Sequence, residues 1–475
     1  MAVEAEKTEK KEGKKELRRV FDEYRALSDE SLQPEKSKEK EFLDAMEGFL
    51  KKDGNQTFLK PYVHNLDLCV KCGTCAETCP VYLASGRKEI YNPVYRSEML
   101  RKIYRRHFTT TGKIFRGLIG AKEVNNDDLN ALAESSWRCS VCRRCAVACP
   151  VALDNGLMTR EIRKIFDDIG IAPDELRENG TWNQVKYGNA TMTPTEAFKD
   201  MIEFVQEDIE DEKGISVDIP LDKKNADYLV MNNAGDYIAF METIMGIVEI
   251  MDAAGVDWTL NTPDSGVNDV VNYGLFYSDK EFMDVANAHV DTLKKLNPKN
   301  VVIGECGHAY DSYVFYNQVF PDLPFNLTTI VDVTDEFIQS GKIKVDPNKN
   351  PEPVTFHDSC KWGRAAGYFD MPRRILKAVC KDFREMYPNR ELNHCCGGGS
   401  GFAIMNKDDF YKFRMETYGK IKAEQVRNTN AKIVATICAN CKGQWREIIN
   451  YHKLNQEGVR FSGLSELVAN AIVYD

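Results

Sequence analysis

Two stretches of the chain carry cysteines at a spacing suited to iron–sulfur chemistry. The first, CVKCGTCAETCP, begins at Cys69, and the second, CSVCRRCAVACP, begins at Cys139. Both follow the pattern C-x2-C-x2-C-x3-C-P, in which three cysteines hold one cluster and the fourth reaches a second cluster. Zinc knuckles are the rival interpretation, but zinc sites rarely place four cysteines at this spacing before a proline. The pattern predicts two cubane [4Fe–4S] clusters that transfer electrons.

The crossed pattern assigns the fourth cysteine of each motif to the cluster of the other motif. One predicted set consists of Cys69, Cys72, Cys75 and Cys149. The other consists of Cys139, Cys142, Cys145 and Cys79. The segment between the motifs is long and has helical periodicity, and in this it resembles the α-helical ferredoxin domain of quinone-linked iron–sulfur subunits.

A third group of cysteines has a different spacing and includes an adjacent pair in NHCCGGGSG, residues 393–401. Its members are Cys360, Cys395, Cys396, Cys438 and Cys441. Cys360 and Cys438 end apolar, strand-like runs, and the carboxyl ends of parallel strands converge on one crevice. Five thiolates suit a larger or opened cluster, and the glycines would let the backbone approach it with positive φ. A phosphate-binding loop is a weak alternative, because no Lys-Ser/Thr follows the glycines.

The composition narrows the class of protein. The chain has 475 residues and a net charge of −10, which argues against nucleic-acid binding. Fifteen cysteines in one chain suggest metal ligands in a reducing compartment. No run approaches the roughly 20 apolar residues of a membrane span, and the charged start lacks the apolar core of a signal peptide. We therefore expect a cytoplasmic protein without a transmembrane span.

The pattern of apolar residues predicts an α plus α/β fold. Helical periodicity dominates up to about residue 180, including a short amphipathic helix at FLDAMEGFL (42–50). From about residue 226, short apolar runs alternate with helical segments, as in α/β layering. Five of these runs predict strands: 227–231, 256–260, 300–306, 353–360 and 432–438. The predicted domains are a charged N-terminal helical arm (1–58), an α-helical ferredoxin domain (59–180), a polar linker (181–220) and two α/β modules (221–348 and 349–475).

The two α/β modules are predicted to be related by an internal repeat. NVVIGECGHAY aligns with KIVATICANCK, which places Cys306 opposite Cys438. Upstream, VDWTLNTPDSG (256–266) aligns with NRELNHCCGGG (389–399). The first module then reads Thr262, Pro263 and Asp264 where the second has its cysteine pair and glycine.

The pattern C-x34-C-C-G-x40-C-x2-C resembles the CCG domain of heterodisulfide reductases. That resemblance implies a noncubane [4Fe–4S] cluster that reduces disulfides directly, with no flavin in this chain. Its implied ligands are Cys360, Cys395, Cys396, Cys438 and Cys441. An α-helical ferredoxin domain followed by two pseudo-symmetric CCG modules resembles the HdrD-type architecture. Because the first module lacks the pair, a second noncubane cluster is not expected.

Within that family, three stretches resemble DsrK-type subunits and the related HmeD and TmcB groups: PVYRSEMLRKIYRR (93–106), CSVCRRC (139–145) and GECGHA (304–309). The resemblance implies a catalytic subunit held at the inner face of a membrane by partner subunits. Electrons would come from quinol through a DsrM-like haem b subunit. The substrate would be a disulfide or trisulfide, on a DsrC-type sulfur carrier or as a small heterodisulfide. The alternative is an electron-transfer-only subunit of a flavin-dependent glycerol-3-phosphate or glycolate dehydrogenase.

Several further residues are candidates for the chemistry. Cys306 has three interpretations. It is a remnant of a lost site, a sixth group near the single cluster, or a thiol that engages substrate sulfur. Cleavage of a sulfur–sulfur bond yields thiolates that need protons, and His308 is the first candidate donor, with His394 and His357 behind it. Cys380 is expected in the core, on an apolar helix face with Leu376, Val379 and Phe383. Eight basic residues between 96 and 122 predict either a docking patch or a solvated helix surface.

Overall fold

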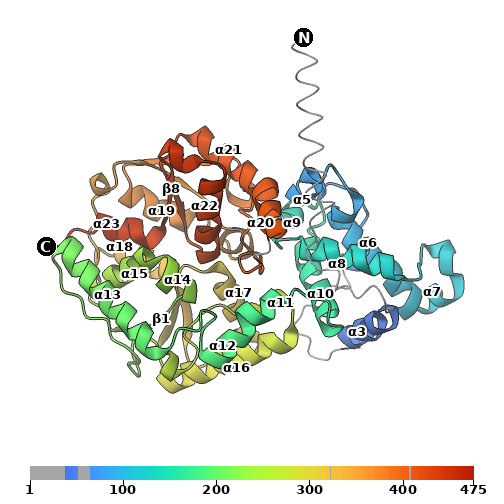
Figure 1. Cartoon of the computed structure of the whole chain (residues 1–475), viewed down its shortest axis with the longest axis horizontal. Coiled ribbons are helices and arrows are strands. Elements are labelled where there is room, and N and C mark those ends of the chain that lie inside the picture. The colour runs from blue at the N-terminus through green and yellow to red at the C-terminus, as the bar shows by residue number, and fades with distance from the viewer. Residues whose placement is uncertain (1–37, 52–64, 321, 406–407, 475) are drawn as a thin grey trace, which may run out of the picture. The chain divides into compact units, whose positions relative to one another are not determined.

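The computed structural model describes residues 38–51, 65–320, 322–405 and 408–474 (Figure 1). The chain forms two compact units. The helical unit comprises the described residues up to Asp174, with Phe276–Asp279 and Gly399–Lys420. The two-sheet unit comprises Glu175–Leu275, Lys280–Gly398 and Ile421–Asp475. Most of the predicted N-terminal arm lies outside the described residues, but its amphipathic helix is confirmed as α3 (Glu39–Lys51), with Phe42, Met46 and Phe49 buried.

The helical unit is built of helices, as the periodicity between and after the cysteine motifs predicts for that part of the chain. They are α5 (Pro80–Ala84), α6 (Pro93–Phe108), α7 (Thr110–Phe115), α8 (Asn126–Trp137), α9 (Arg144–Ala148), α10 (Asn155–Asp168) and α20 (Asp408–Arg414), with the short helices η1 (Glu89–Tyr91), η2 (Arg116–Ile119) and η9 (Met415–Gly419). Helix α8 is capped by Asn125, whose side chain accepts from the Asp128 amide.

The two-sheet unit contains two four-stranded parallel sheets. Their strand orders are β2-β1-β3-β4 and β6-β5-β7-β8. The strands are β1 (Tyr228–Met231), β2 (Trp258–Leu260), β3 (Asn300–Ile303), β4 (Asn326–Thr329), β5 (Pro353–Phe356), β6 (Asp382–Arg384), β7 (Ile433–Thr436) and β8 (Arg460–Gly463). Every ladder is parallel, so all carboxyl ends within one sheet lie at the same edge. The α plus α/β class is confirmed.

Helices connect and cover the strands of this unit. They are α11 (Asp174–Leu176), α12 (Trp182–Tyr187), α13 (Thr195–Lys213), α14 (Ala234–Ala239), α15 (Met241–Ala253), α16 (Asp279–Leu296), α17 (Gly307–Val319), α18 (Ile330–Gln339), α19 (Asp370–Val379), α21 (Lys420–Thr429), α22 (Ala439–Tyr451) and α23 (Leu464–Ala471). Helices α15 and α23 lie side by side (Figure 1). Gly246 of α15 makes this close approach possible, because a Cβ there would lie 2.6 Å from the Ser465 backbone.

The five apolar runs that predicted strands are confirmed as β1, β2, β3, β5 and β7. The strands β4, β6 and β8 escaped prediction because they are short, polar sheet edges. The repeat alignment of 256–266 with 389–399 differs from the sheet order, in which β6 occupies the place that β2 has in the other sheet. Residues 390–392 form a 3-10 helix instead of a strand.

The segment 181–220 is structured, in contrast to the predicted linker. It contains α12 and the long helix α13, which buries Phe198, Ile202, Val205 and Ile209. The acidic residues that suggested a linker occupy the exposed positions between these apolar ones. The segment Gly399–Lys420 also departs from the predicted boundary of the second module, because its internal contacts place it in the helical unit.

Candidate iron–sulfur centres

The two ferredoxin-type loops of the helical unit have the same unusual backbone conformation. In the first motif, Lys71 and Gly73 have φ of 59° and 81°. In the second, Val141 and Arg143 occupy the same motif positions with φ of 49° and 62°. Positive φ is rare for any residue other than glycine and disfavoured for valine. Its recurrence at matched positions fits two loops that wrap around the same kind of group.

Gly73→Ala tests this backbone requirement. A Cβ at Gly73 would meet no atom within 4 Å. The cost of the substitution therefore comes only from the φ of +81°, which is unfavourable for alanine. We expect a loss of about 1 kcal/mol in the free energy of unfolding. The matched control is Gly48→Ala in α3, which also has open space but helical φ. That variant should gain up to about 1 kcal/mol. Equal effects of the two changes in thermal unfolding would contradict the argument.

The first predicted cysteine set gathers around Cys75. Burial raises the pKa of Cys75 to about 11, and the nearby Cys69, Cys149 and Cys72 add to the shift. These neighbours are the set expected from the crossed pattern, including the fourth cysteine from the other motif. Arg101 donates to the Cys69 carbonyl at 3.0 Å. Cys72 is the solvent-exposed member of the set.

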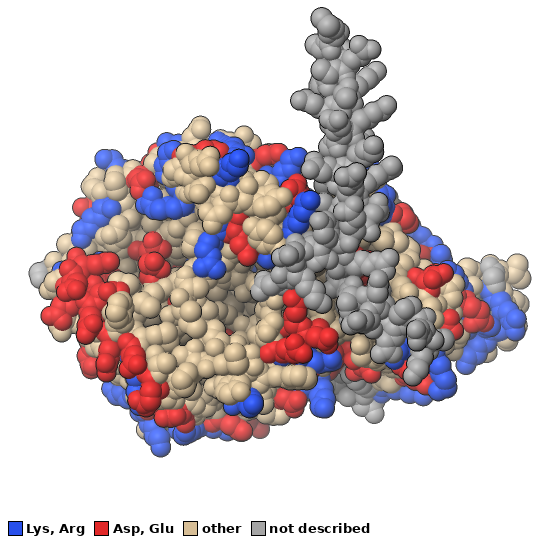
Figure 2. Space-filling view, viewed as in Figure 1, with Lys and Arg blue, Asp and Glu red and all other residues tan. Residues whose placement is uncertain are grey.

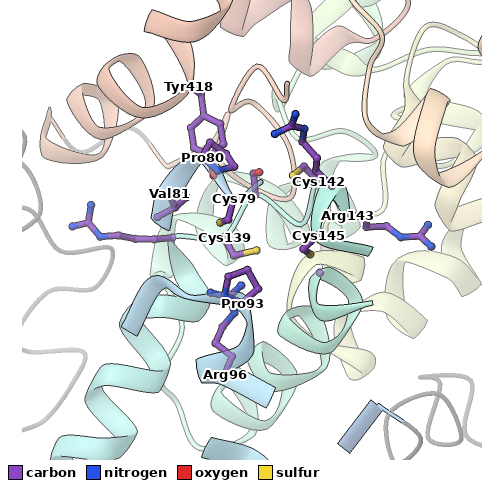
Figure 3. Close-up of a pocket in the computed structure, with 14 residues that line it drawn as sticks. Cys79, Pro80, Val81, Pro93, Arg96, Cys139, Cys142, Arg143, Cys145 and Tyr418 are labelled. Atoms are coloured by element: carbon purple, nitrogen blue, oxygen red, sulfur yellow. The ribbon is translucent and has the colours of Figure 1, made fainter. Parts of the chain in front are cut away.

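The four cysteines of the second set line one cavity, which Figure 3 shows. The cysteines on its wall are Cys79, Cys139, Cys142 and Cys145. Burial raises the pKa of Cys79 to about 12, and Cys139 and Cys142 are among the charges that act on it. Tyr418 also lines the cavity. The structure therefore brings together both predicted sets, and clustered thiols with wrapping loops fit [4Fe–4S] groups.

Buried arginines surround the second set, and sequence reasoning missed them. The Arg163 guanidinium donates to the carbonyls of Ser136 at 3.0 Å, Cys139 at 2.6 Å and Ser400 at 3.0 Å. This interaction ties the segment that follows the CCG motif to the motif that begins at Cys139. Arg138 lies over the Phe413 ring at 4.7 Å. No local pattern signals these contacts, because they join residues far apart in the sequence.

Part of the predicted basic face between residues 96 and 122 is buried inside the helical unit. Arg96 and Arg101 are buried. Arg96 donates to Thr159 at 2.8 Å, and its charge lowers the pKa of both Cys75 and Cys79, against burial. Lys122 pairs with Asp128 at 2.6 Å. The cationic side chains at α7 remain exposed.

The third cysteine group lies in the two-sheet unit, and four of its sulfurs form a chain of contacts from Cys395 through Cys396 and Cys441 to Cys438. Cys438 caps α22, and Cys441 lies in its first turn. Cys396 and Cys441 have sulfurs 3.3 Å apart, and the Gly397 amide donates to the Cys395 sulfur at 3.3 Å. All four are buried.

The positive φ predicted for the loop glycines occurs at Gly397 and Gly401. Gly397 has a φ of 90°, and a Cβ on Gly398 would lie 2.6 Å from the Asn440 carbonyl oxygen. The chain can therefore pass close to the start of α22.

Cys360 is the fifth cysteine and lies at the start of the π-helix η7 (Lys361–Ala365). Among the described residues, its sulfur is within hydrogen-bonding distance of none of the other four. It is nevertheless buried. Its loop is tied to the cysteine pair, because Asn393 donates to the Asp358 carbonyl at 2.5 Å. Short π-helices often mark functional sites.

The contacts among these thiols shift their pKa values in opposite directions. Hydrogen bonds with Cys395 and Cys441 hold the pKa of Cys396 well below its usual value, against burial. A hydrogen bond with Cys441 does the same for Cys438, whose place at a helix N-terminus also favours the thiolate. The same contacts raise the pKa of Cys441. Buried thiols that contact one another fit a metal cluster as their common partner.

The three candidate histidines differ in position. His357 lies beside Cys396 and Cys441, with its ring nitrogen and their sulfurs all within 4.8 Å of one another. His308 is buried, hydrogen-bonds to Cys438, and has Nδ1 3.0 Å from the Asn440 amide nitrogen. His394 precedes the cysteine pair and is half-buried. The structure thus brings His357, ranked last from sequence, next to the cysteine pair.

Cys306 lies in the first module at the place where Cys438 lies in the second. Each follows a strand and caps a helix, with φ of −141° and −144°. Cys306 is buried, and Cys438 is a close charge that helps to raise its pKa well above the usual value, after burial. A Cβ on the next residue, Gly307, would lie 2.7 Å from Lys361. The GECGHA turn therefore packs against both Cys438 and the loop of Cys360.

A buried ion network fixes this turn to the second module. The Lys442 ammonium lies 2.9 Å from the Asp236 carboxylate and 3.3 Å from that of Glu305. It also donates to Thr243 at 2.7 Å. Lys442 follows Cys441 and Glu305 precedes Cys306, so the network holds the two cysteine-bearing turns together. All three charged residues are buried, where removal of one partner is costly.

A second buried lysine, Lys422, is adjacent to the cysteine group and was missed from the sequence. Its ammonium donates to Met386, Asn393 and Gln425, all neutral acceptors, at 2.8, 3.0 and 2.7 Å. Burial lowers its pKa to about 7, while Cys396 is the leading charge that opposes this shift.

Cys380 is buried, as predicted, but it ends α19 instead of lying on the helix face. Phe383, expected on the same helix, belongs to strand β6.

Comparisons with known families and proteins match this geometry. Residues 65–153 match the 4Fe-4S dicluster domain, and residues 354–446 match the cysteine-rich domain called CCG. These ranges contain both ferredoxin-type motifs and all five cysteines of the third group. Among the described residues, none of the helices has the length and apolar character needed to cross a membrane.

Relatives with similar sequences span most of this chain. An Hdr-like menaquinol oxidoreductase iron-sulfur subunit of Archaeoglobus fulgidus is 28% identical, over 91% of this chain and 83% of its own length. A subunit of the dihydromethanophenazine:CoB–CoM heterodisulfide reductase of Methanosarcina barkeri is 25% identical, over 86% and 94%. An EtfAB:quinone oxidoreductase of Syntrophomonas wolfei is 21% identical, over 79% and 54%.

These likenesses indicate [4Fe–4S] cofactors and an electron-transfer role in an oxidoreductase. This chain therefore carries a 4Fe-4S dicluster domain followed by a CCG domain, and in this order and along most of its length it is similar to HdrD-type iron–sulfur proteins.

Proposed function

We propose that the chain is the catalytic iron–sulfur subunit of a membrane-associated redox complex and reduces a sulfur–sulfur bond. Two cubane [4Fe–4S] clusters would pass electrons to one noncubane [4Fe–4S] cluster, which supplies the reduction of a disulfide or trisulfide. The proposed ligands are the three cysteine groups described above. The observation that carries the proposal is the buried contact among Cys395, Cys396, Cys438 and Cys441 in the CCG module.

The order of electron transfer follows from the exposure of the two sets in the helical unit. Cys72 of the first set is exposed, whereas no cysteine of the second set is. An electron donor could therefore approach the first set more closely. The second set is bonded through Arg163 to Ser400, four residues beyond Cys396. We infer that electrons arrive at the first set and leave from the second toward the CCG module.

The proposed electron donor is a membrane haem b subunit that oxidises quinol, and α7 with η2 is its proposed docking surface. Ile114, Phe115 and Leu118 are 65%, 52% and 89% exposed. Basic side chains gather over α7 (Figure 2). Exposed apolar side chains flanked by cations are typical of a surface that meets a partner at a membrane. Helix α6, which leads into α7, carries the Arg101 that contacts Cys69.

Phe115→Ser with Leu118→Ser tests this surface. Each buried apolar side chain contributes about 1.5–3 kcal/mol at an interface, so we expect binding to membranes that contain the partner subunits to weaken at least tenfold. Phe204→Ser on α13, 55% exposed before the change, is the matched control and should bind normally. Unchanged sedimentation of the double variant with partner-containing membranes would exclude α7 as the docking surface.

The second candidate function is electron transfer alone, with a separate flavoprotein performing the chemistry. The likeness to a protein named EtfAB:quinone oxidoreductase favours this alternative. The two functions differ in what the CCG module does with thiols. In the first, the module binds substrate sulfur. In the second, it passes electrons to a partner.

Electron paramagnetic resonance separates the two functions. The purified full chain would be oxidised in the presence of a dithiol or a sulfur-carrier peptide with a terminal cysteine. A thiol-dependent paramagnetic signal, lost in Cys441→Ser, is expected for the catalytic function. No such signal with any thiol, together with stable binding of a flavoprotein, would establish the electron-transfer function instead.

A further inference from the structure

Lys422 is a buried cation with an unusual set of partners. Its side chain is fully buried. Its three hydrogen bonds go to a thioether, an amide oxygen of Asn393 and an amide oxygen of Gln425. Among the described residues, no carboxylate lies within 4 Å of its ammonium. A buried ammonium without a counter-charge is strongly disfavoured, in keeping with the pKa that burial lowers to about 7. A negative charge in its surroundings favours the ammonium form.

The carboxylate in these surroundings is already neutralised. Asp358 forms a bidentate ion pair with Arg373, with N–O distances of 2.7 and 2.9 Å. The Arg390 amide also donates to Asp358 at 2.7 Å. The other charges that act on Lys422 are the sulfurs of Cys396, Cys395 and Cys441.

The position of the ammonium is fixed by its surroundings. Asn393 both accepts from Lys422 and donates to the Asp358 carbonyl. Gln425 accepts from Lys422 and donates to the Pro388 carbonyl at 3.0 Å. The Trp445 ring lies 5.6 Å from the ammonium, a distance at which the ring face attracts a cation. Lys422 therefore cannot swing out to solvent without breaking several buried contacts.

We propose that Lys422 is the charge-compensating residue of the CCG centre, and that its fixed ammonium raises the reduction potential of the group held by Cys395, Cys396 and Cys441. The inference rests on the proposed cysteine-held centre. Reduction adds one negative charge to that group, and a cation held in a medium of low dielectric constant stabilises the added charge. In this role Lys422 contacts no substrate and acts only through the fixed position of its positive charge.

A redox titration followed by electron paramagnetic resonance tests the proposal. Lys422→Met removes the charge while keeping the length of the side chain, and Lys422→Arg keeps the charge. We expect the Met variant to disfavour reduction at least tenfold, equivalent to about 59 mV for a one-electron couple. The Arg variant should stay near the parent. Lys164→Met is a matched control, because Lys164 is buried in the helical unit and paired with Glu161 and Asp279.

The outcomes separate this inference from the proposed function. An unchanged potential in the Met variant, with full iron content, would overturn the role of Lys422 and leave the centre intact. Absence of a third centre in the parent chain would overturn the proposed function itself. If Lys422→Met empties the site, Lys422→Gln supplies the measurement, because it keeps hydrogen-bond donors without the charge. An unchanged potential in the Gln variant would then overturn the inference.

Discussion

Replacement of Cys396 by serine is expected to remove one iron–sulfur centre of three and leave the other two in place. Cys396 contacts both Cys395 and Cys441 in the CCG module. Its sulfur lies 3.3 Å from that of Cys441 and beside the ring of His357. A neutral hydroxyl is a poor substitute for a thiolate ligand. The purified variant should therefore lose about one third of its iron and acid-labile sulfide, if each centre holds four irons.

Cys380→Ser is the matched control for this loss. Cys380 is also buried, but it belongs to none of the three cysteine groups. Its variant should keep the full iron content, with some loss of stability. Full iron in the Cys396 variant would show that the CCG cysteines hold no cluster. Loss of all iron would show instead that the variant had unfolded, and a far-UV circular dichroism spectrum distinguishes that case.

The cysteine sets were predictable because their spacing is a local property of the sequence. A motif such as CSVCRRC specifies its own loop, and its ligands follow from the loop geometry. The strands β1, β3, β5 and β7 were predictable for a similar reason, since each is a short buried apolar run. Both features depend on residues that are near one another in the chain.

The residues that surround the centres were not predictable in this way. Lys422 lies on a helix of polar composition, and nothing in its neighbours signals that it faces the cysteine pair. Arg163 and Tyr418 contribute to the surroundings of the second set from positions far from its motifs. His357 was ranked below His308, because its contact with Cys396 depends on how the strand β5 is placed in its sheet. Burial and charge pairing of this kind appear only in three dimensions.

The structure also changes what can be expected of Cys306. The thiol is fully buried, which disfavours direct attack on a bulk-solvent substrate in this conformation. It nevertheless lies next to Cys438, and His308 follows it by two residues and hydrogen-bonds to the same Cys438. These contacts agree with a sixth group beside the CCG centre, where the thiol would meet substrate sulfur only after that sulfur is held at the centre.

Cys306→Ser is therefore expected to abolish disulfide reduction while all three centres remain. The side chain lies beside Cys438 but is not one of the proposed ligands, so its loss should affect the handling of sulfur instead of iron. We expect turnover with a dithiol–disulfide couple to fall at least about a hundredfold, with iron content and cubane signals unchanged. Loss of iron together with turnover would make Cys306 a ligand, and unchanged turnover would make it a structural residue. Thr262→Ala, in the same module but bonded to Asp222 away from the cysteines, is the control and should retain activity.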